Sequence, residues 1–238
     1  MSHKININII TMFPQMFEYF KYGLLSKSIG SICNLNIIDL KIFGKHNRVD
    51  DTTYGGHGMI IKPDVIQKCL EHYNIVNNIY ITSPRGRIWD QDYVHNIKKD
   101  IILGEQNKPY IMSIICGRYE GIDQRVIDYY NMIEISIGDV ILTGGELPSM
   151  LIIDSLLRTI PGTLGNNNSL DDSFSKCNLE HDNYTKPYIW NSISVPNVLL
   201  SGNHKLIYKW KLDNNKKKTI KNRPDLLYKL INMIGKII

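Results

Sequence analysis

The sequence predicts an α/β protein with a mostly parallel sheet, followed by a small basic helical module. Three observations support this prediction. Segments with strand character alternate four or five times with segments of helical periodicity between residues 4 and 158. Tyr110–Cys116 is a continuous apolar run, which is typical of a central strand buried on both faces. Residues 205–238 show helical patterns and are rich in lysine.

Each element of the α/β part has its own signal. Apolar alternation or apolar runs predict strands at 4–10, 35–43, 78–82, 110–116 and 133–142. Helical spacing of apolar residues predicts helices at 15–20, 63–73, 90–101, 124–130 and 146–158. Ligands of parallel sheets lie beyond the carboxyl ends of the strands. We therefore expect the loops after Thr82, Cys116 and Leu142 to converge on one site.

The stretch 133–158 has the clearest organisation in the chain. Its apolar run at 140–142 predicts a largely buried strand, and the pair Gly144-Gly145 permits a sharp turn or the close approach of a ligand. Glu146 and Pro148 then suit the first turn of a helix. A strand, a glycine turn and a helix start predict a small-ligand site, although the bare pattern fits an ordinary α/β corner equally well.

Composition excludes several classes of protein. The chain is 43% hydrophobic and 21% charged, as in soluble globular proteins. No span has the roughly 20 apolar residues of a membrane helix, and the N-terminal segment lacks a cleavable signal pattern, so we expect a cytoplasmic protein. The four scattered cysteines predict neither a disulfide framework nor a structural zinc site. The dinucleotide, P-loop and zinc-deaminase signatures are all missing.

Positive charge is concentrated at the C-terminal end. Residues 205–238 hold ten Lys/Arg and two acids, whereas the whole chain has a net charge of +5. A basic module beside a near-neutral body indicates a phosphate-bearing partner, unless genomic composition bias explains part of the lysine excess. The patterns predict helices at 205–210 and 224–234 with a lysine-rich turn at 214–223. The polar segment 162–186 predicts a mobile linker.

Several strings, in the same order along the chain, resemble the bacterial tRNA (guanine-N1)-methyltransferases. SIGDVILTGGELP at 136–148 resembles the cofactor loop of that family almost letter for letter. The remaining strings are Met12-Phe13-Pro14, the loop 48–58 with Arg-Val-Asp-Asp and Tyr-Gly-Gly, Asp172-Ser173-Phe174, the linker signature 179–187, and Pro224–Leu227. The family belongs to the trefoil-knotted (SPOUT) class of S-adenosylmethionine-dependent methyltransferases.

This resemblance implies a domain organisation. Residues 1–161 would form a knotted α/β domain, in which a deep trefoil knot binds S-adenosylmethionine. Residues 162–187 would form a flexible interdomain linker that carries the catalytic aspartate, and residues 188–238 a basic, all-helical tRNA-binding domain. The knot is implied by the resemblance alone, because general topology rules disfavour threaded chains.

The implied reaction is methylation of N1 of the guanosine immediately 3′ of the anticodon. N1 carries a proton at neutral pH, which a carboxylate within hydrogen-bond reach can remove. Charge then accumulates on guanine O6, where a guanidinium is useful. The resemblance assigns these roles to Asp172 and Arg158. Without it, Asp172 would be a solvated linker acid like Asp171, and Arg158 would form a helix-surface ion pair with Asp154.

The resemblance also implies the binding residues. Those for the cofactor are Pro84, Gly117, Glu120, Ile137, Gly138, Asp139, Val140, Ile141, Leu142, Gly144, Gly145 and Pro148. Apolar residues suit this role because adenine needs a flat apolar slot with a few peptide hydrogen bonds. Val140 replaces a tyrosine that is usual in the family loop. The expected RNA contacts are Asp50, Arg118, Arg125 and Lys186.

The expected partners are tRNA and a second copy of the chain, with no DNA and no membrane. In the family the knot of one subunit faces the linker and C-terminal domain of the other. No metal site is expected, while assistance by Mg²⁺ stays open. Two alternatives remain: a non-catalytic knotted RNA-binding module, or a knotted methylase with another RNA target. The presence of both Arg158 and Asp172 argues against the first, and the linker and C-terminal signatures argue against the second.

Overall fold

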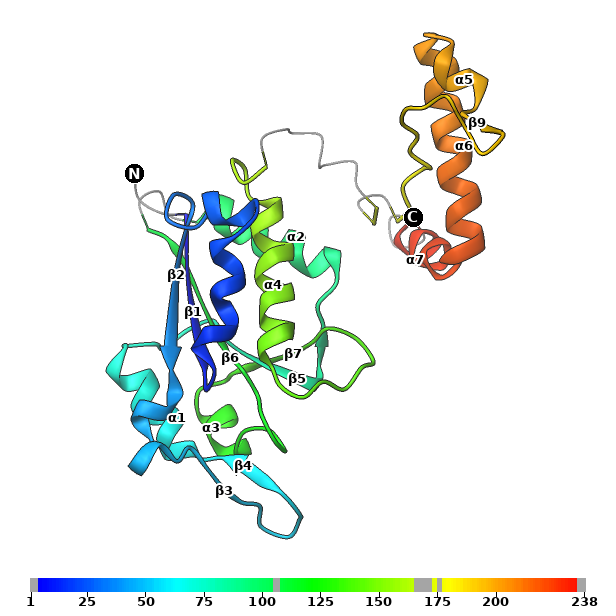
Figure 1. The fold of residues 1–238 in the computed structure, drawn as a ribbon. Helices are drawn as coiled ribbons and strands as arrows, with labels where there is room; N and C mark the ends of the chain where they lie inside the picture. Colours follow the sequence, from blue (N-terminus) through cyan, green and yellow to red (C-terminus); the bar gives the residue numbers. More distant parts are fainter. Residues whose placement is uncertain (1–3, 105–107, 165–172, 175–176, 235–238) are drawn as a thin grey trace. The chain divides into compact units, whose positions relative to one another are not determined.

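The computed structural model describes residues 4–104, 108–164, 173–174 and 177–234. The chain forms two compact units, Met1–Gly165 and Asn166–Ile238. Strands and helices alternate in the first unit, whereas the described part of the second unit is mostly helical (Figure 1).

A five-stranded parallel sheet forms the centre of the first unit, in the order β2-β1-β6-β5-β7 (Figure 1). Its strands are β1 (Ile5–Thr11), β2 (Cys33–Asp39), β5 (Ile79–Ile88), β6 (Tyr110–Ile115) and β7 (Ile133–Ser136). In the middle of the sheet β1 pairs with β6, from Ile5 opposite Tyr110 to Ile10 opposite Ile115. The predicted α/β fold with a parallel sheet is confirmed.

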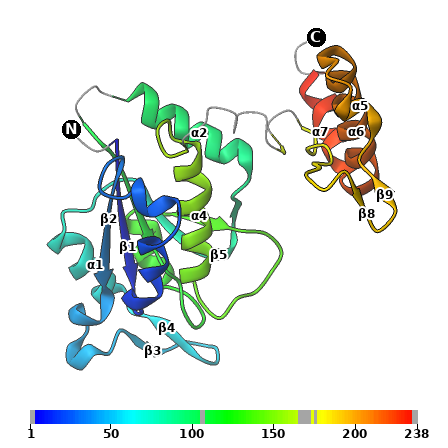
Figure 2. The same ribbon diagram turned by 45° about the horizontal axis from the view of Figure 1, so that its top comes forward.

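Helices cover both faces of this sheet, which explains the near-continuous apolar sequences of β1 and β6 (Figure 2). The elements on one face are η1 (Pro14–Lys21), η2 (Leu25–Lys27), α2 (Gln91–Leu103) and α4 (Glu146–Thr159). The elements on the other face are η3 (Leu40–Phe43), α1 (Pro63–His72) and α3 (Gln124–Tyr129). The predicted helices at 63–73, 90–101, 124–130 and 146–158 are therefore confirmed.

The last strand is shorter than predicted. β7 ends at Ser136, and the apolar residues Val140, Ile141 and Leu142 lie in an open loop with exposed fractions of 54%, 80% and 41%. The chain leaves the sheet because the Ser136 hydroxyl accepts a hydrogen bond from the Gly138 amide (3.1 Å), and Gly138 adopts a φ of 129°. The predicted buried strand at 140–142 is wrong.

Two other elements differ in length or type. β2 stops at Asp39, whose carboxylate accepts a hydrogen bond from the Lys41 amide (2.9 Å) and so starts η3. The segment predicted as a helix at 15–20 is a 3-10 helix, which buries Phe17 and Phe20. The polar loop that follows η3 contains η4 (Lys45–Asn47) and an antiparallel hairpin of β3 (Asp50–Thr52) and β4 (Met59–Ile61).

β5 extends beyond the predicted strand at 78–82. Its pairing with β7 shifts register between Thr82 and Arg87, so residues 83–86 form a bulge. Gly86 lies directly against the β7 backbone, where an added Cβ would be 2.3 Å from the Glu134 carbonyl carbon and from the Ile135 nitrogen. Only glycine permits this approach.

The described part of the second unit combines helices with one short hairpin. Its elements are β8 (Ile189–Trp190), β9 (Ile193–Ser194), α5 (Asn197–Leu200), α6 (His204–Asn222) and α7 (Asp225–Ile234). Because α6 is continuous, the predicted lysine-rich turn at 214–223 is wrong. Lysine is a good helix former, and a lysine-rich segment carries no turn signal of its own.

Contacts along α6 explain why the helix continues. Thr219 donates a hydrogen bond to the Asn215 carbonyl (2.8 Å) and accepts one from the Leu179 amide (2.9 Å). Asp182 forms an ion pair with Lys218 and bonds to Asn214. Part of the segment expected to be linker therefore packs against α6.

We expect Gly86→Ala to destabilise the first unit by about 1–3 kcal/mol, because the added methyl group overpacks the junction of β5 and β7. Urea denaturation measures this change in the free energy of unfolding. Gly56→Ala is the control, since its Cβ would meet only the Thr53 side chain, at 3.2 Å. A Gly86→Ala protein as stable as the control would contradict the described bulge.

Candidate functional site

A cavity of about 360 Å³ lies at the carboxyl ends of β5, β6 and β7. Its walls come from the β5 bulge, from the loop after β6 and from the loop between β7 and α4. The prediction that the loops after Thr82, Cys116 and Leu142 converge is confirmed. Parallel sheets place their ligands at this edge, so the cavity is the candidate functional site.

Most of the residues predicted to bind a cofactor line this cavity. Ten of the twelve do so: Pro84, Gly117, Glu120, Ile137, Val140, Ile141, Leu142, Gly144, Gly145 and Pro148. Gly138 and Asp139 belong to the same loop but are outside the lining. The lining describes position, and binding by these residues stays a prediction.

Two glycines allow the start of α4 to pack tightly against the cavity wall. A Cβ on Gly144 would lie 2.2 Å from the Arg118 Nε atom, and one on Gly145 would lie 2.0 Å from the Thr82 hydroxyl. The Gly145 amide donates a hydrogen bond to the Gly117 carbonyl (2.7 Å). The glycine pair was predicted to permit a sharp turn or the close approach of a ligand. In the structure it permits the close approach of two protein segments.

An ion pair joins this wall to the start of α4, and its arginine, Arg118, also lines the cavity. Arg118 Nη2 is 2.8 Å from Glu146 Oε2, and Arg118 Nη1 donates to the Thr143 carbonyl (3.1 Å). The guanidinium also lies 4.4 Å from the centre of the Phe13 ring. The Thr11 hydroxyl donates to Glu146 Oε1 (2.9 Å). This arrangement connects β1, the loop after β6 and the start of α4.

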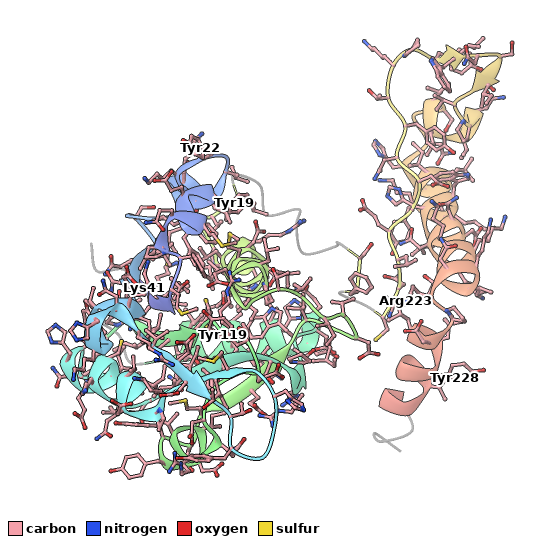
Figure 3. All side chains as sticks on the ribbon, turned by 60° about the horizontal axis from the view of Figure 1, so that its bottom comes forward. Tyr19, Tyr22, Lys41, Tyr119, Arg223 and Tyr228 are labelled. Carbon is pink, nitrogen blue, oxygen red and sulfur yellow. The ribbon has the colours of Figure 1, made fainter. Side chains whose placement is uncertain are left out.

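Burial raises the pKa of two titratable groups around the cavity, Cys116 and Tyr119. Burial raises the pKa of the Cys116 thiol to about 12, so this cysteine is protonated at neutral pH and unsuited as a nucleophile. Burial, with the nearby Asp50 carboxylate as a further cause, raises the pKa of Tyr119. Tyr119 lines the cavity and is labelled in Figure 3. Because Asp50 acts on the Tyr119 hydroxyl, this predicted RNA contact lies next to a cavity residue.

The other predicted RNA contacts have different surroundings. Arg125 is exposed at the start of α3 and bonds to the Asp123 carboxylate (2.7 and 2.9 Å), which lowers the pKa of Asp123. Lys186 is an exposed residue of the second unit. Arg118 lines the cavity, but its side chain is only 17% exposed and is paired with Glu146.

The two predicted catalytic residues are separate from the cavity or outside the described residues. Asp172 lies outside the described residues. Arg158 is exposed in the last turn of α4, whose first turn lines the cavity. Arg158 lies twelve positions after Glu146 in the helix, which corresponds to a rise of about 18 Å. Asp154, its predicted surface partner, accepts a hydrogen bond from the Tyr19 hydroxyl (3.0 Å).

The sequence interpretation missed several cavity residues. They are polar side chains of the same three loops and of β7: Ser83, Arg85, Tyr119 and Thr143 from the loops, and Glu134 and Ser136 from β7. Arg85 forms an ion pair with Glu134 (2.7 Å). For the loop residues, the position directly after a predicted strand was the available signal, whereas Glu134 and Ser136 lie inside the strand predicted at 133–142. Glu146 was assigned to the helix dipole, and nothing in the sequence indicated its partner.

Neither a metal cluster nor a membrane helix occurs in the part of the chain that the structure describes. No three His, Cys, Asp or Glu side chains there are grouped so that they could hold a metal ion. Likewise, none of the helices in those residues combines the length and the apolar character needed to span a bilayer.

Comparisons with known proteins agree over nearly the whole chain. A family described as tRNA (guanine-1)-methyltransferase TrmD matches residues 5–229. The tRNA (guanine-N(1)-)-methyltransferase of Rickettsia akari (strain Hartford) is 43% identical over 241 residues, covering 94% of this chain and 97% of that protein. The enzyme of the same name from Sulfurihydrogenibium sp. (strain YO3AOP1) is 46% identical over 234 residues, covering 94% of this chain and 88% of that protein. The chain therefore belongs to the tRNA (guanine-1)-methyltransferase family.

Proposed function

We propose that this protein transfers a methyl group from S-adenosylmethionine to N1 of the guanosine immediately 3′ of the anticodon in tRNA. The observation that carries the proposal is the family match over residues 5–229, combined with a cavity lined by residues of the segment 136–148, which resembles the family's cofactor loop. The basic segment 205–238 supports a tRNA substrate, because phosphate groups attract lysine-rich surfaces.

The cavity residues fit this cofactor. The side chains of Val140, Ile141 and Leu142 offer an apolar surface to an adenine ring. Among the described residues, no partner accepts a hydrogen bond from the main-chain amides of Ile141 and Leu142, so both can serve a ligand. The Glu120 carboxylate lines the same cavity and suits the positive charges of the cofactor. When bound, S-adenosylmethionine supplies an activated methyl group.

The chain supplies the proton transfer and the charge stabilisation. The Asp172 carboxylate takes the proton from guanine N1, which frees the N1 lone pair to form the bond to the methyl carbon as the carbon–sulfur bond breaks. The Arg158 guanidinium stabilises the charge on guanine O6. The target base leaves the stacked anticodon loop to reach the site, as base-modifying enzymes require.

We also propose the deep trefoil knot of the family for residues 1–161. The tight contact of Gly145 with Gly117 and Thr82 supports it, because the loop before α4 lies against the carboxyl ends of β5 and β6. Residues 162–187 would then connect this domain to the tRNA-binding domain at 188–238 and carry Asp172.

The active enzyme is a homodimer in this proposal. Because Arg158 lies about 18 Å along α4 from the cavity end of the helix, a single α4 cannot bring Arg158 to its own cofactor cavity. A second copy can. An exposed apolar stripe, suited to a protein contact, extends from Leu147 and Leu151 of α4 to the neighbouring η1. Tyr19 of η1 and Tyr22, the residue directly after η1, are also exposed (Figure 3).

We expect Asp172→Asn to lower the rate of methyl transfer to unmodified tRNA by about 10²–10⁴-fold, because the general base is lost. Asp171→Asn is the matched control and should stay active. Transfer of labelled methyl groups measures the rate, and calorimetry verifies that both variants bind S-adenosylmethionine. An Asp172→Asn protein as fast as wild type would disprove the assigned base.

Mixing two inactive variants tests the shared site. Gly145→Leu blocks the cofactor cavity, and Asp172→Asn removes the base. Subunits mixed at random should recover about a quarter of the wild-type activity, because half of the dimers then contain one complete site. If each chain used its own aspartate, the mixture would stay inactive, and that result would contradict the shared active site.

The substrate assignment is tested with two transcripts of one tRNA, with guanosine or adenosine immediately 3′ of the anticodon. We expect methylation of the first only, with N1-methylguanosine identified by mass spectrometry of nucleosides. Equal methylation of both would indicate another RNA target. Wild-type binding of tRNA without any methyl transfer would indicate a non-catalytic RNA-binding module.

A further inference from the structure

Three segments of the first unit meet at the Arg118–Glu146 ion pair. Glu146 belongs to the first turn of α4, and its carboxylate is held by Arg118 on one oxygen and by Thr11 of β1 on the other. Arg118 belongs to the loop after β6 and also holds the Thr143 carbonyl of the loop before α4. One side chain thus fixes two walls of the cavity to each other.

Burial distinguishes this pair from the other ion pairs between described residues. The Glu146 side chain is 1% exposed and that of Arg118 is 17% exposed, whereas every other such pair has at least one partner above one third. A buried charge without its partner is strongly destabilising, so each residue depends on the other. The start of α4 further favours the negative charge of Glu146.

The surroundings leave the pair little freedom to rearrange. Gly144 lies under the guanidinium, since a Cβ there would be 2.2–2.7 Å from three Arg118 side-chain atoms. Phe13 covers the guanidinium, with 4.4 Å between Arg118 Cζ and the ring centre. The position of the Thr143–Gly145 backbone is therefore coupled to the position of the Arg118 side chain.

We infer that Arg118 and Glu146 are positioning residues that set the shape of the cofactor cavity, and that Arg118 is not a phosphate contact. The inference rests on the proposed function, because the loops that the pair joins are those that would hold S-adenosylmethionine. The reacting atoms must be aligned closely in such a transfer, and a displacement of about 1 Å can cost 10²-fold in rate.

The test compares Arg118→Met, Glu146→Leu and the double variant with wild type. Calorimetry without tRNA measures the dissociation constant for S-adenosylmethionine. Each single variant should bind the cofactor about tenfold more weakly, because one buried charge is left unpaired. The double variant should lose less affinity for S-adenosylmethionine than the two single variants combined, since neither charge then remains. Arg118→Lys keeps the positive charge but cannot contact Glu146 and the Thr143 carbonyl through two separate nitrogens. It should recover part of the affinity.

Hydrogen exchange of the Thr143–Gly145 amides provides a second measurement that needs no cofactor. Exchange should be faster in both single variants and unchanged in the controls Lys68→Met and Asp64→Leu. These controls remove the partners of an exposed ion pair (3.4 Å) in the first turns of α1. If a single variant fails to fold, Glu146→Gln replaces it, since Gln keeps the size of the side chain and an acceptor for Thr11.

Two results would overturn the inference. One is Arg118→Met with unchanged cofactor affinity and unchanged exchange, but a raised KM for tRNA and a salt dependence reduced by about one phosphate contact. That result would restore Arg118 as an RNA contact. The other is unchanged exchange in all variants. If wild type itself binds no S-adenosylmethionine, the proposed function fails, and the exchange measurement still decides whether the pair orders the wall.

Discussion

The close approach of the start of α4 to the carboxyl ends of β5 and β6 determines most of the site. Gly145 touches Thr82 and Gly117 so closely that no side chain fits between them. This contact brings the loop before α4 over the ends of two neighbouring strands and creates a cavity where a parallel sheet would otherwise end in solvent. The apolar side chains at 140–142 lie outside the core and line this cavity.

α4 has two ends with different chemistry. Its first turn is buried and takes part in the cavity wall, whereas its last turn carries the exposed Arg158. Its buried face, formed by Ile152, Ile153, Leu156 and Leu157, fixes the helix to the sheet. A rigid helix of this length keeps the two ends apart, and in the proposed dimer each chain therefore lends one end to each of two sites.

Most of the α/β fold could be predicted, because periodicity reports burial directly. Val65, Ile66, Cys69 and Leu70 are spaced for one face of a helix, and all four are buried in α1. The apolar run at 140–142 misled the interpretation, because a strand in a core and a loop around an apolar ligand need the same residue types. The lysine-rich stretch of α6 misled it for another reason: its helix is stabilised by contacts with residues 179–182, which local sequence does not show.

The general location of the candidate site could also be predicted, but not its internal contacts. Sequence indicated which loops converge, since the carboxyl ends of parallel strands lie at the same edge of the sheet. It could not pair Arg118 with Glu146, because the pair forms only when separate loops are packed together. The assignment of Asp172 came from resemblance alone, and the residue lies outside the described part of the chain.

The order of strands has a consequence for how the chain folds during synthesis. β1 lies between β2 and β6, so the first strand made by the ribosome obtains its second neighbour only after Tyr110 has emerged. Until then one edge of β1 has no strand beside it, and its apolar side chains lack part of their cover. Sheets with such distant pairings form slowly and expose aggregation-prone edges meanwhile. A chaperone that shields this edge would therefore protect the nascent chain until β6 has been made.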